Sequence, residues 1–188
     1  MGEPVDRWLP QWMELQRYVF EQRFFRENLK LGEGGETGEL NRLLEETFNR
    51  TGASIMGKRM FDGGEQAWPE EAPLHTAVFV LTNQVRAPWE RPGGTTLYFV
   101  NARIESALRR SRDAAGERDI RIAGGANVIQ QYLSAGLVDE FSIAVSPVLL
   151  GPGLCLFNGV DRSALALETV ATIDSPLVTH LTCSVRRR

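Results

Sequence analysis

The chain contains the segment Gly52-Ala-Ser-Ile-Met-Gly57-Lys58-Arg59. It is close to G-x-x-x-x-G-K-[ST], the loop that binds the phosphates of ATP or GTP. Two features argue against a triphosphate site. The four residues between the glycines are largely apolar and typical of a strand, and Arg59 stands where the magnesium-binding Ser or Thr belongs. A nucleoside triphosphatase is therefore the less favoured of two interpretations.

The other interpretation is a dinucleotide site. A strand that ends at Gly57 and continues into a helix starting with Lys58 and Arg59 would place unpaired backbone N–H groups and two cations together, which favours an anion. The same strand–glycine–helix pattern recurs at Gly124-Gly125. Each junction alone is a weak indication, because glycines also serve tight turns. Two in one parallel sheet could hold the pyrophosphate of a dinucleotide.

The elements that must position these residues follow from hydrophobic periodicity. Buried strands are predicted at 53–57, 77–82, 95–100 and 119–123, with helices at 102–115 and 126–135. A helical turn at 58–61 is expected to break at Gly63-Gly64. This alternation predicts an α/β protein with a parallel sheet covered on both faces. Further strands at 140–145, 165–173 and 178–185 have no helix between them, so we expect them to add antiparallel strands to an edge of the sheet.

The N-terminal part is predicted to be helical. Trp8, Trp12, Leu15 and Val19 recur at helical spacing, which predicts one amphipathic helix over 7–28 with Asp6 as its N-cap. A glycine-rich surface loop at 31–38 and a helix at 39–50 follow. The chain has 188 residues and no linker-like stretch. We therefore expect one domain overall, with the N-terminal amphipathic helix in residues 1–30 and the α/β domain in residues 31–188.

Composition narrows the function classes. The formal net charge of −3 gives no reason to expect a nucleic-acid partner. No apolar run approaches the roughly 20 residues that span a bilayer, and the N-terminus lacks the pattern of a secretion signal, so we expect a cytoplasmic protein without membrane contact. Cys155 and Cys183 are predicted to be buried free thiols, with a lone disulfide as the alternative. His75 and His180 lack partners at metal-ligand spacing, so no metal site is expected.

One long run of residues resembles a known family. The run is Ile122-Ala-Gly-Gly-Ala-Asn-Val-Ile-Gln-Gln-Tyr-Leu-Ser-Ala-Gly-Leu-Val-Asp-Glu140, continued by Ala144-Val-Ser-Pro-Val-Leu-Leu-Gly151 and Gly153-Leu-Cys-Leu-Phe157. It resembles the dihydrofolate-reductase-like superfamily, and within it the reductase domain of the bifunctional riboflavin-biosynthesis deaminase–reductase. The segments 56–61 and 78–82 are similar to two further family signatures. The resemblance covers roughly residues 31–185.

The resemblance implies a dihydrofolate-reductase-like three-layer fold, with a mostly parallel central sheet and antiparallel C-terminal strands. It also implies an NADPH cofactor whose pyrophosphate lies between the two glycine junctions and whose adenosine ribose lies near the end of the 77–82 strand. By position, the implied cofactor-binding residues are Gly57, Lys58, Arg59, Met60, Thr82, Asn83, Gly124, Gly125, Ala126, Asn127 and Val128. No catalytic residue is implied.

The chain departs from the family pattern at three places. Met60 stands where the family often has Thr, and Thr82-Asn83 stands where it often has Ser-Arg at the 2′-phosphate. Arg86 lies close enough in sequence to supply that charge, and no acidic residue follows the strand, which favours NADPH over NADH. The family's opening strand, ending near Ser-Leu-Asp-Gly, is not found, so either that segment has been cut from this chain or the pocket is built differently.

Two functions follow as hypotheses. The first is an NADPH-dependent reductase of a small heterocyclic substrate of pterin or aminopyrimidine type, related to 5-amino-6-(5-phosphoribosylamino)uracil reductase. The second is a non-catalytic nucleotide-binding or dimerisation module that has lost the substrate pocket, since a fold alone does not prove activity. The resemblance implies a homodimer in either case. The substrate, the proton donor and the pathway stay open.

Overall fold

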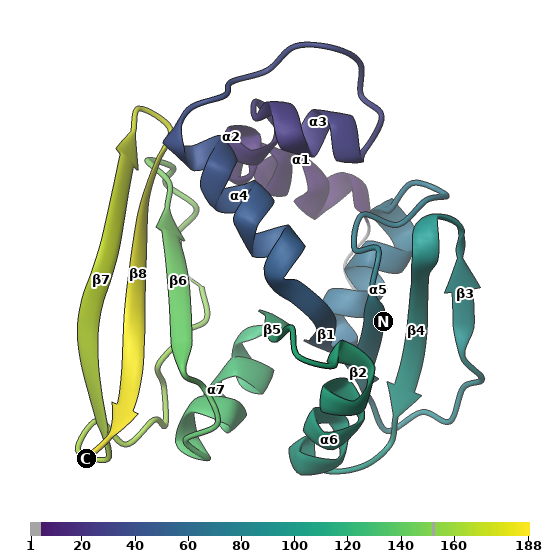
Figure 1. The fold of residues 1–188 in the computed structure, drawn as a ribbon, viewed down its shortest axis with the longest axis vertical. Coiled ribbons are helices and arrows are strands. Elements are labelled where there is room, and N and C mark those ends of the chain that lie inside the picture. Colours follow the sequence, from purple (N-terminus) through teal and green to yellow (C-terminus); the bar gives the residue numbers. More distant parts are fainter. Residues whose placement is uncertain (1–4, 152) are drawn as a thin grey trace.

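The computed structural model describes residues 5–151 and 153–188. Its larger sheet has five strands in the order β3-β4-β2-β1-β5, and its smaller sheet has three in the order β6-β8-β7 (Figure 1). The strands of the larger sheet are β1 (Thr51–Gly57), β2 (Ala77–Leu81), β3 (Trp89–Arg91), β4 (Thr95–Val100) and β5 (Asp119–Gly124). The four predicted strands are thus confirmed. The short β3 was not predicted.

The larger sheet is parallel apart from β3, which pairs antiparallel with β4. Its register aligns the carboxyl ends of four strands. Gly57 lies beside Leu81, Leu81 beside Val100, and Met56 beside Gly124. The residues that follow these strands are therefore brought to a single edge of the sheet.

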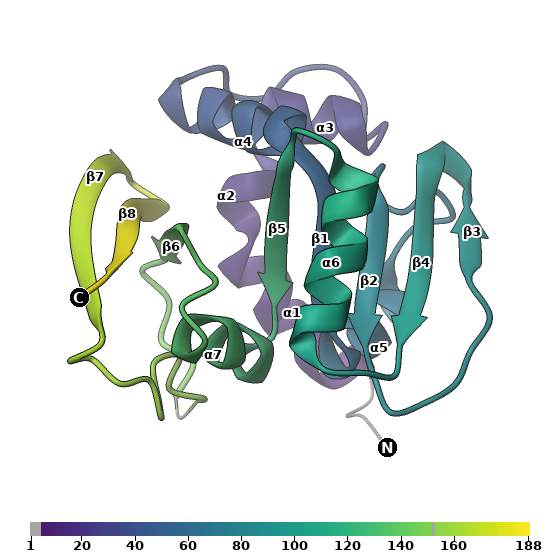
Figure 2. The same cartoon turned by 60° about the horizontal axis from the view of Figure 1, so that its bottom comes forward.

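Helices cover both faces of the larger sheet. α5 (Lys58–Ala67) packs on one face, where Phe61 meets Met56, Val78 and Val80. α6 (Ile104–Ala115) and α7 (Ala126–Ser134) pack on the other face against a separate apolar cluster that includes Ile55 (Figure 2). Every residue of β1 is buried, as the continuous apolar run predicted.

The predicted break at Gly63-Gly64 is wrong, because α5 continues through both glycines to Ala67. A side chain at Gly64 would have its Cβ only 2.2 Å from the ring of Trp68. A Cβ at Gly63 would touch the ring of Trp8 at 3.6 Å. The contact at Gly63 is an ordinary van der Waals distance, whereas Gly64 is needed for the Trp68 ring to approach the helix, and that packing outweighs the low helix propensity of glycine.

The single N-terminal helix is also a wrong prediction, because the segment forms three short helices. They are α1 (Val5–Leu15), α2 (Arg17–Phe20) and α3 (Arg23–Asn28), followed by the predicted α4 (Glu39–Arg50). The break before α3 has a clear cause in the 31–38 loop. The backbone N–H of Arg23 donates to the carbonyl of Glu36, and the N–H of Glu36 donates to the carbonyl of Glu21. These bonds replace helical ones.

The smaller sheet is antiparallel and consists of β6 (Glu140–Val145), β7 (Leu165–Ser175) and β8 (Val178–Arg187). We expected these strands at an edge of the larger sheet, and that detail is wrong, since β6 pairs only with β8 among the described residues. The smaller sheet is held instead by the N-terminal helices. Tyr18 and Leu40 pack with Val178 in a third apolar cluster.

The structure also bears on the two cysteines and on membrane-spanning helices. Both cysteines are free, but only Cys183 is buried, so the prediction of two buried thiols is wrong for the exposed Cys155. Within residues 5–151 and 153–188, no helix combines the length and the apolar character that a bilayer crossing requires.

Candidate functional site

The strand order of the larger sheet reverses at one place, between β1 and β5. The chain runs from β1 through β2 to β4 in one direction and then returns to β5 on the other side of β1. α5 leaves β1 on one face, whereas α6 leads into β5 on the opposite face. In open α/β sheets, ligands bind at such a reversal, outside the carboxyl ends of the strands. Here that place is the edge formed by Gly57 and Gly124.

The structure brings the two glycine junctions together at this edge. A Cβ on Gly57 would lie 2.9 Å from Cγ2 of Val128, 3.7 Å from the nitrogen of Gly125 and 3.8 Å from the carbonyl oxygen of Gly124. Gly124 has a φ of +137°, which side-chain-bearing residues rarely adopt, and its peptide bond to Gly125 is cis. The sulfur of Met60 lies 3.1 Å from the position that a Cβ on Gly124 would take.

Both helices that start here have free amino ends. Gly57 is the N-cap of α5 and Gly125 the N-cap of α7, and no side chain caps either helix. The first backbone N–H groups of the two helices are therefore open to an acceptor, apart from that of Val128, which donates to the carbonyl of Gly125 at 3.0 Å. Because the helix dipoles place partial positive charge at the same ends, an anionic group would be stabilised between them.

The two predicted cations differ in their surroundings. Lys58 forms an ion pair with Asp62, one turn along α5. Arg59 is exposed, and no ion pair or side-chain hydrogen bond joins it to another described residue. Arg59 is thus the cation of α5 that is available to a ligand, and the charge of Lys58 is partly compensated.

Arg86, which sequence reasoning placed near the 2′-phosphate, is already engaged. Its guanidinium carbon lies 4.7 Å from the ring centroid of Phe99 and 5.0 Å from that of Trp89, and its Nη1 donates to Oε1 of Glu65 at 2.8 Å. Cation–π contacts and an ion pair therefore hold this side chain against α5 and the sheet. Its positive charge has a partner without any cofactor.

Thr82 and Asn83 follow β2 at the same edge. Thr82 is buried, its N–H donates to the carbonyl of Val100, and its hydroxyl accepts a hydrogen bond from the N–H of Gln84 at 3.1 Å. Asn83 is exposed. Of this pair, only the Asn83 side chain is open to solvent, while Thr82 shapes the turn.

A cleft of about 600 Å³ lies between the start of α6 and α7, next to the glycine edge. Its walls include Arg103, Glu105, Asn127, Gln130 and Gln131. Small-molecule sites have volumes of roughly 300–1,000 Å³. Among these residues, sequence reasoning selected only Asn127. The two glutamines lie one turn further along the same helix, which is the signal that could have found them.

A buried tyrosine, Tyr132, joins the two helices that border the cleft. The hydroxyl of Tyr132 donates to the carbonyl of Ile104 at 2.8 Å and so ties α7 to the first turn of α6. Burial, with a smaller contribution from Glu105, raises the pKa of Tyr132, so the phenol keeps its proton and remains a donor. On the other wall, Nε2 of Gln130 donates to the carbonyl of Cys155 at 2.8 Å.

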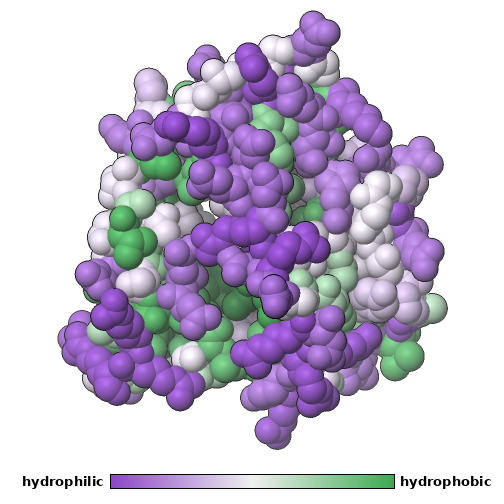
Figure 3. Space-filling view, viewed as in Figure 1, coloured by the Kyte–Doolittle hydropathy of each residue, from purple (hydrophilic) through white to green (hydrophobic). Residues whose placement is uncertain are grey.

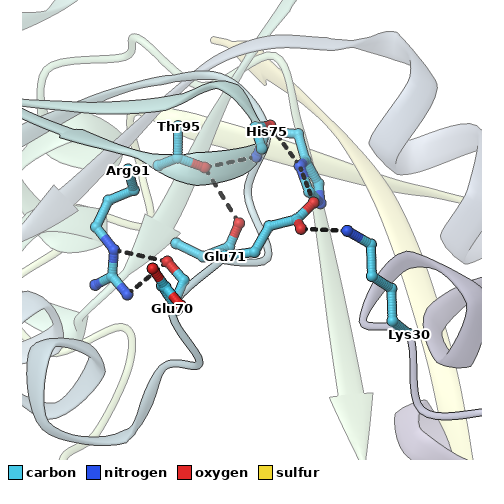
Figure 4. Close-up of polar contacts among 8 residues, drawn as sticks. Lys30, Glu70, Glu71, His75, Arg91 and Thr95 are labelled. Atoms are coloured by element: carbon cyan, nitrogen blue, oxygen red, sulfur yellow. Dashed lines mark hydrogen bonds and ion pairs between the residues drawn. The ribbon is translucent and has the colours of Figure 1, made fainter.

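A second polar cluster lies at the opposite, amino-terminal ends of β2 and β4 (Figure 4). The N–H of His75 donates to Oγ1 of Thr95 at 2.9 Å, and its Nδ1 lies 2.7 Å from the carbonyl oxygen of Gly93. Lys30 pairs with Glu71 at 2.5 Å. These contacts fix the loop before β2 to the start of β4 and to the segment that follows α3, at the opposite ends of the strands from the glycine edge.

The other histidine, His180, lies in the interior of the protein. Its ring centroid is 5.3 Å from that of Tyr18. Across the described residues, no group of three or more His, Cys, Asp or Glu side chains could hold a metal ion.

Comparison with known sequences gives the family. Residues 34–179 match the model of the RibD C-terminal domain. The uncharacterised protein YyaP of Bacillus subtilis (strain 168) is 36% identical over 138 residues, which are 70% of this chain and 73% of YyaP. The uncharacterised protein YwjB of the same organism is 37% identical over 60 residues, 32% of this chain and 34% of YwjB.

Solved structures agree in fold. A protein assigned to riboflavin biosynthesis from Shewanella sp. PV-4 has a TM-score of 0.61 at 23% identity, covering 86% of this chain and 88% of that one. A pyrimidine reductase-like protein from Corynebacterium diphtheriae has a TM-score of 0.52 at 13% identity over 81% and 83% of the two chains. RibD of Acinetobacter baumannii has a TM-score of 0.56 at 16% identity over 81% and 52%. Because the family model matches most of its length, this chain belongs to the RibD C-terminal domain family and has the dihydrofolate-reductase-like fold.

Proposed function

We propose that this protein is a reductase that uses NADPH to reduce a small heterocyclic substrate of pterin or aminopyrimidine type. The observation that carries the proposal is the meeting of two strand–glycine–helix junctions at the reversal point of a parallel sheet. Membership of the RibD C-terminal domain family supports a reductase-like role. The likeness to a pyrimidine reductase-like protein is consistent with a substrate of this class.

The residues at the edge fit a dinucleotide pyrophosphate. Gly57, Gly124 and Gly125 present backbone without side chains, and a Cβ on Gly57 would enter the narrow space beside Val128. The open N–H groups of α5 and α7 would hold phosphate oxygens, with Arg59 as the nearby free cation. When bound, the nicotinamide ring supplies the hydride, and the protein contributes binding and orientation.

An assembly of two copies is part of this proposal. The last residue of β6 and the segment that follows it expose several large apolar side chains. By exposed fraction they are Leu149 102%, Leu154 74%, Val145 61%, Leu150 46% and Phe157 42%. On the face drawn in Figure 3, apolar surface gathers on the side of the smaller sheet and α7, against a largely hydrophilic remainder. Exposed apolar surface of this kind favours a protein partner, for which a second copy of the chain is the simplest.

The same surface supports the alternative function, a nucleotide-binding or dimerisation module without catalysis. The two functions differ in one measurable respect. A reductase oxidises NADPH in the presence of a suitable substrate. A non-catalytic module binds the cofactor without oxidising it, or binds only a second copy of the chain.

The test is a titration of the purified protein with NADPH and with NADH, followed by tryptophan fluorescence. Saturable binding of NADPH, followed by its oxidation with a pterin or aminopyrimidine substrate, is the expected result. Binding without oxidation across both substrate classes would favour the non-catalytic module. Binding of neither dinucleotide would overturn the proposal.

A further inference from the structure

We propose that Arg103 binds the ribose 2′-phosphate of NADPH and that the cleft between α6 and α7 receives the adenosine half of the cofactor. This inference rests on the proposed function and deepens it by naming a residue that determines cofactor specificity. It moves the recognition of the 2′-phosphate from the loop after β2, where the resemblance placed it, to the segment after β4.

The cleft adjoins the glycine edge through α7. Asn127, a wall residue of the cleft, lies two positions after Gly125, the N-cap of the same helix. The nitrogen of Gly125 is in turn 3.7 Å from the Cβ position of Gly57. A dinucleotide whose pyrophosphate lay at this edge would therefore place one of its two halves at the cleft.

The exposure and the polar lining of the cleft suit the adenosine half of the cofactor better than the nicotinamide half. Arg103, Glu105, Asn127 and Gln131 are all exposed to solvent, and most of the residues that line the cleft have polar side chains. Hydride transfer requires a site from which water is excluded, so this open cleft does not suit the nicotinamide ring. A purine base needs only a few donors and acceptors beside an apolar contact, which the carboxamides and Ile104 offer.

Arg103 is the cation of this cleft, and it is free. It is the N-cap of α6, so it lies at the positive end of that helix. No ion pair or side-chain hydrogen bond joins Arg103 to another described residue. Arg86, in contrast, is paired with Glu65 and stacked on aromatic rings. A 2′-phosphate would thus find its bidentate partner in Arg103 and not in Arg86.

Glu105 should have the opposite effect to Arg103 on the preference between NADPH and NADH. It lies in the first turn of α6 and lines the same cleft. A carboxylate beside the ribose repels a 2′-phosphate and accepts a hydrogen bond from a 2′-hydroxyl, which favours NADH. The preference of the wild type therefore reflects the balance of two side chains, and each can be removed separately.

The experiment measures the dissociation constants of NADPH and NADH for the wild type, Arg103→Ala and Glu105→Gln. Arg109→Ala is the control, because Arg109 is an exposed arginine of α6 outside the cleft. The Arg103→Ala change should weaken NADPH about 10- to 100-fold, as expected for loss of hydrogen bonds to a charged group, and leave NADH within about twofold. Glu105→Gln should shift the preference toward NADPH.

Three outcomes decide the matter. A loss of affinity by Arg103→Ala for NADPH and for 2′,5′-ADP, with NADH and ADP unaffected, supports the inference, and partial rescue by Arg103→Lys supports it further. A wild type that binds NADPH while Arg103→Ala binds it equally well would overturn the inference and leave the proposed function standing. A wild type that binds neither dinucleotide would overturn both. Thermal unfolding of each variant identifies one that has simply failed to fold.

Discussion

The two sheets of this molecule differ in how they are buried. In the larger sheet, β1 is buried along its whole length between helices on both faces, whereas six consecutive residues of β7 in the smaller sheet are exposed. Burial on both faces determines the register of a parallel strand strongly, because each residue must fit a helix layer. The aligned strand ends that bring Gly57 to Gly124 follow from that constraint, so the candidate site belongs to the more constrained sheet.

The largest effect that separates the two sheets should come from Phe61. This side chain is fully buried and makes edge-to-face contacts with Phe99, Trp68 and Trp89. Phe61→Ala should lower the free energy of unfolding by about 3–5 kcal/mol, whereas Leu167→Ala on β7, 54% exposed, should change it by less than about 0.5 kcal/mol. Urea unfolding measures both. A comparable cost for Leu167→Ala would mean that another molecule covers β7.

The next effect concerns the edge of the larger sheet. In Gly57→Ala, the new Cβ would lie 2.9 Å from Cγ2 of Val128, a stiff β-branched side chain, so strain of about 1–3 kcal/mol is expected. NADPH affinity should fall as well, because the methyl group occupies the approach to Gly125. In the double variant Gly57→Ala/Val128→Ala, stability should recover in part while affinity stays low. Unchanged NADPH affinity in Gly57→Ala would show that the cofactor does not approach this edge.

The strands of the larger sheet were predictable because they are short runs rich in apolar residues, two of which end at glycines, Gly57 and Gly124. Its helices α6 and α7 were predictable because apolar residues recur in them at helical spacing. Local sequence could not reveal the break before Arg23, since it depends on hydrogen bonds to Glu36. The passage of α5 through Gly64 was equally hidden, because it depends on where the Trp68 ring lies. The C-terminal strands were visible as strand-like segments without a helix between them, but such a segment does not reveal which strand it pairs with.

The candidate site also combines features that local sequence reveals with features that depend on tertiary contacts. The two glycine junctions are local patterns and were visible in the sequence, and the structure places them side by side. The engagement of Arg86 with Phe99 and Glu65 is a tertiary contact and was not visible. The cleft at Arg103 lies between α6 and α7, which the hydrogen bond of Tyr132 joins, and no spacing within either helix reveals that contact.

A smaller effect is expected on the pH dependence of the free energy of unfolding, through His180 on the buried face of the smaller sheet. Burial lowers the pKa of His180 below its ordinary value of about 6.5, and neither ring nitrogen has a hydrogen-bond partner among the described residues. As the pH falls below about 6.5, the unfolded chain therefore takes up a proton at His180 before the folded chain does, and the free energy of unfolding decreases until the folded pKa is passed.

In His180→Phe, that contribution to the pH dependence is absent, and an aromatic ring still faces Tyr18. Urea unfolding between about pH 7 and pH 5 should therefore show a smaller loss of stability in the variant than in the wild type, by about 1.4 kcal/mol per unit of pKa separation. Equal losses in the two proteins would mean that the His180 ring is reached by water in solution.

The smallest effect concerns the one ion-pair group that joins the starts of the two sheets in the described structure. Arg50, at the end of α4, pairs with Asp119 at the start of β5 and with Glu140 at the start of β6, the second at 3.0 Å. All three side chains are 41–53% exposed, so Arg50→Gln should cost only about 0.2–1 kcal/mol, and less in about 1 M salt. The matched control is Arg17→Gln, which removes an exposed pair with Glu21 that joins no strands.

If Arg50 links the sheets, Arg50→Gln alone should also speed amide exchange at the start of β6, because β6 has no strand partner on the side of β5. Equal exchange in the two variants would mean that the N-terminal helices, through Tyr18 and Val178, are sufficient to hold the smaller sheet in place.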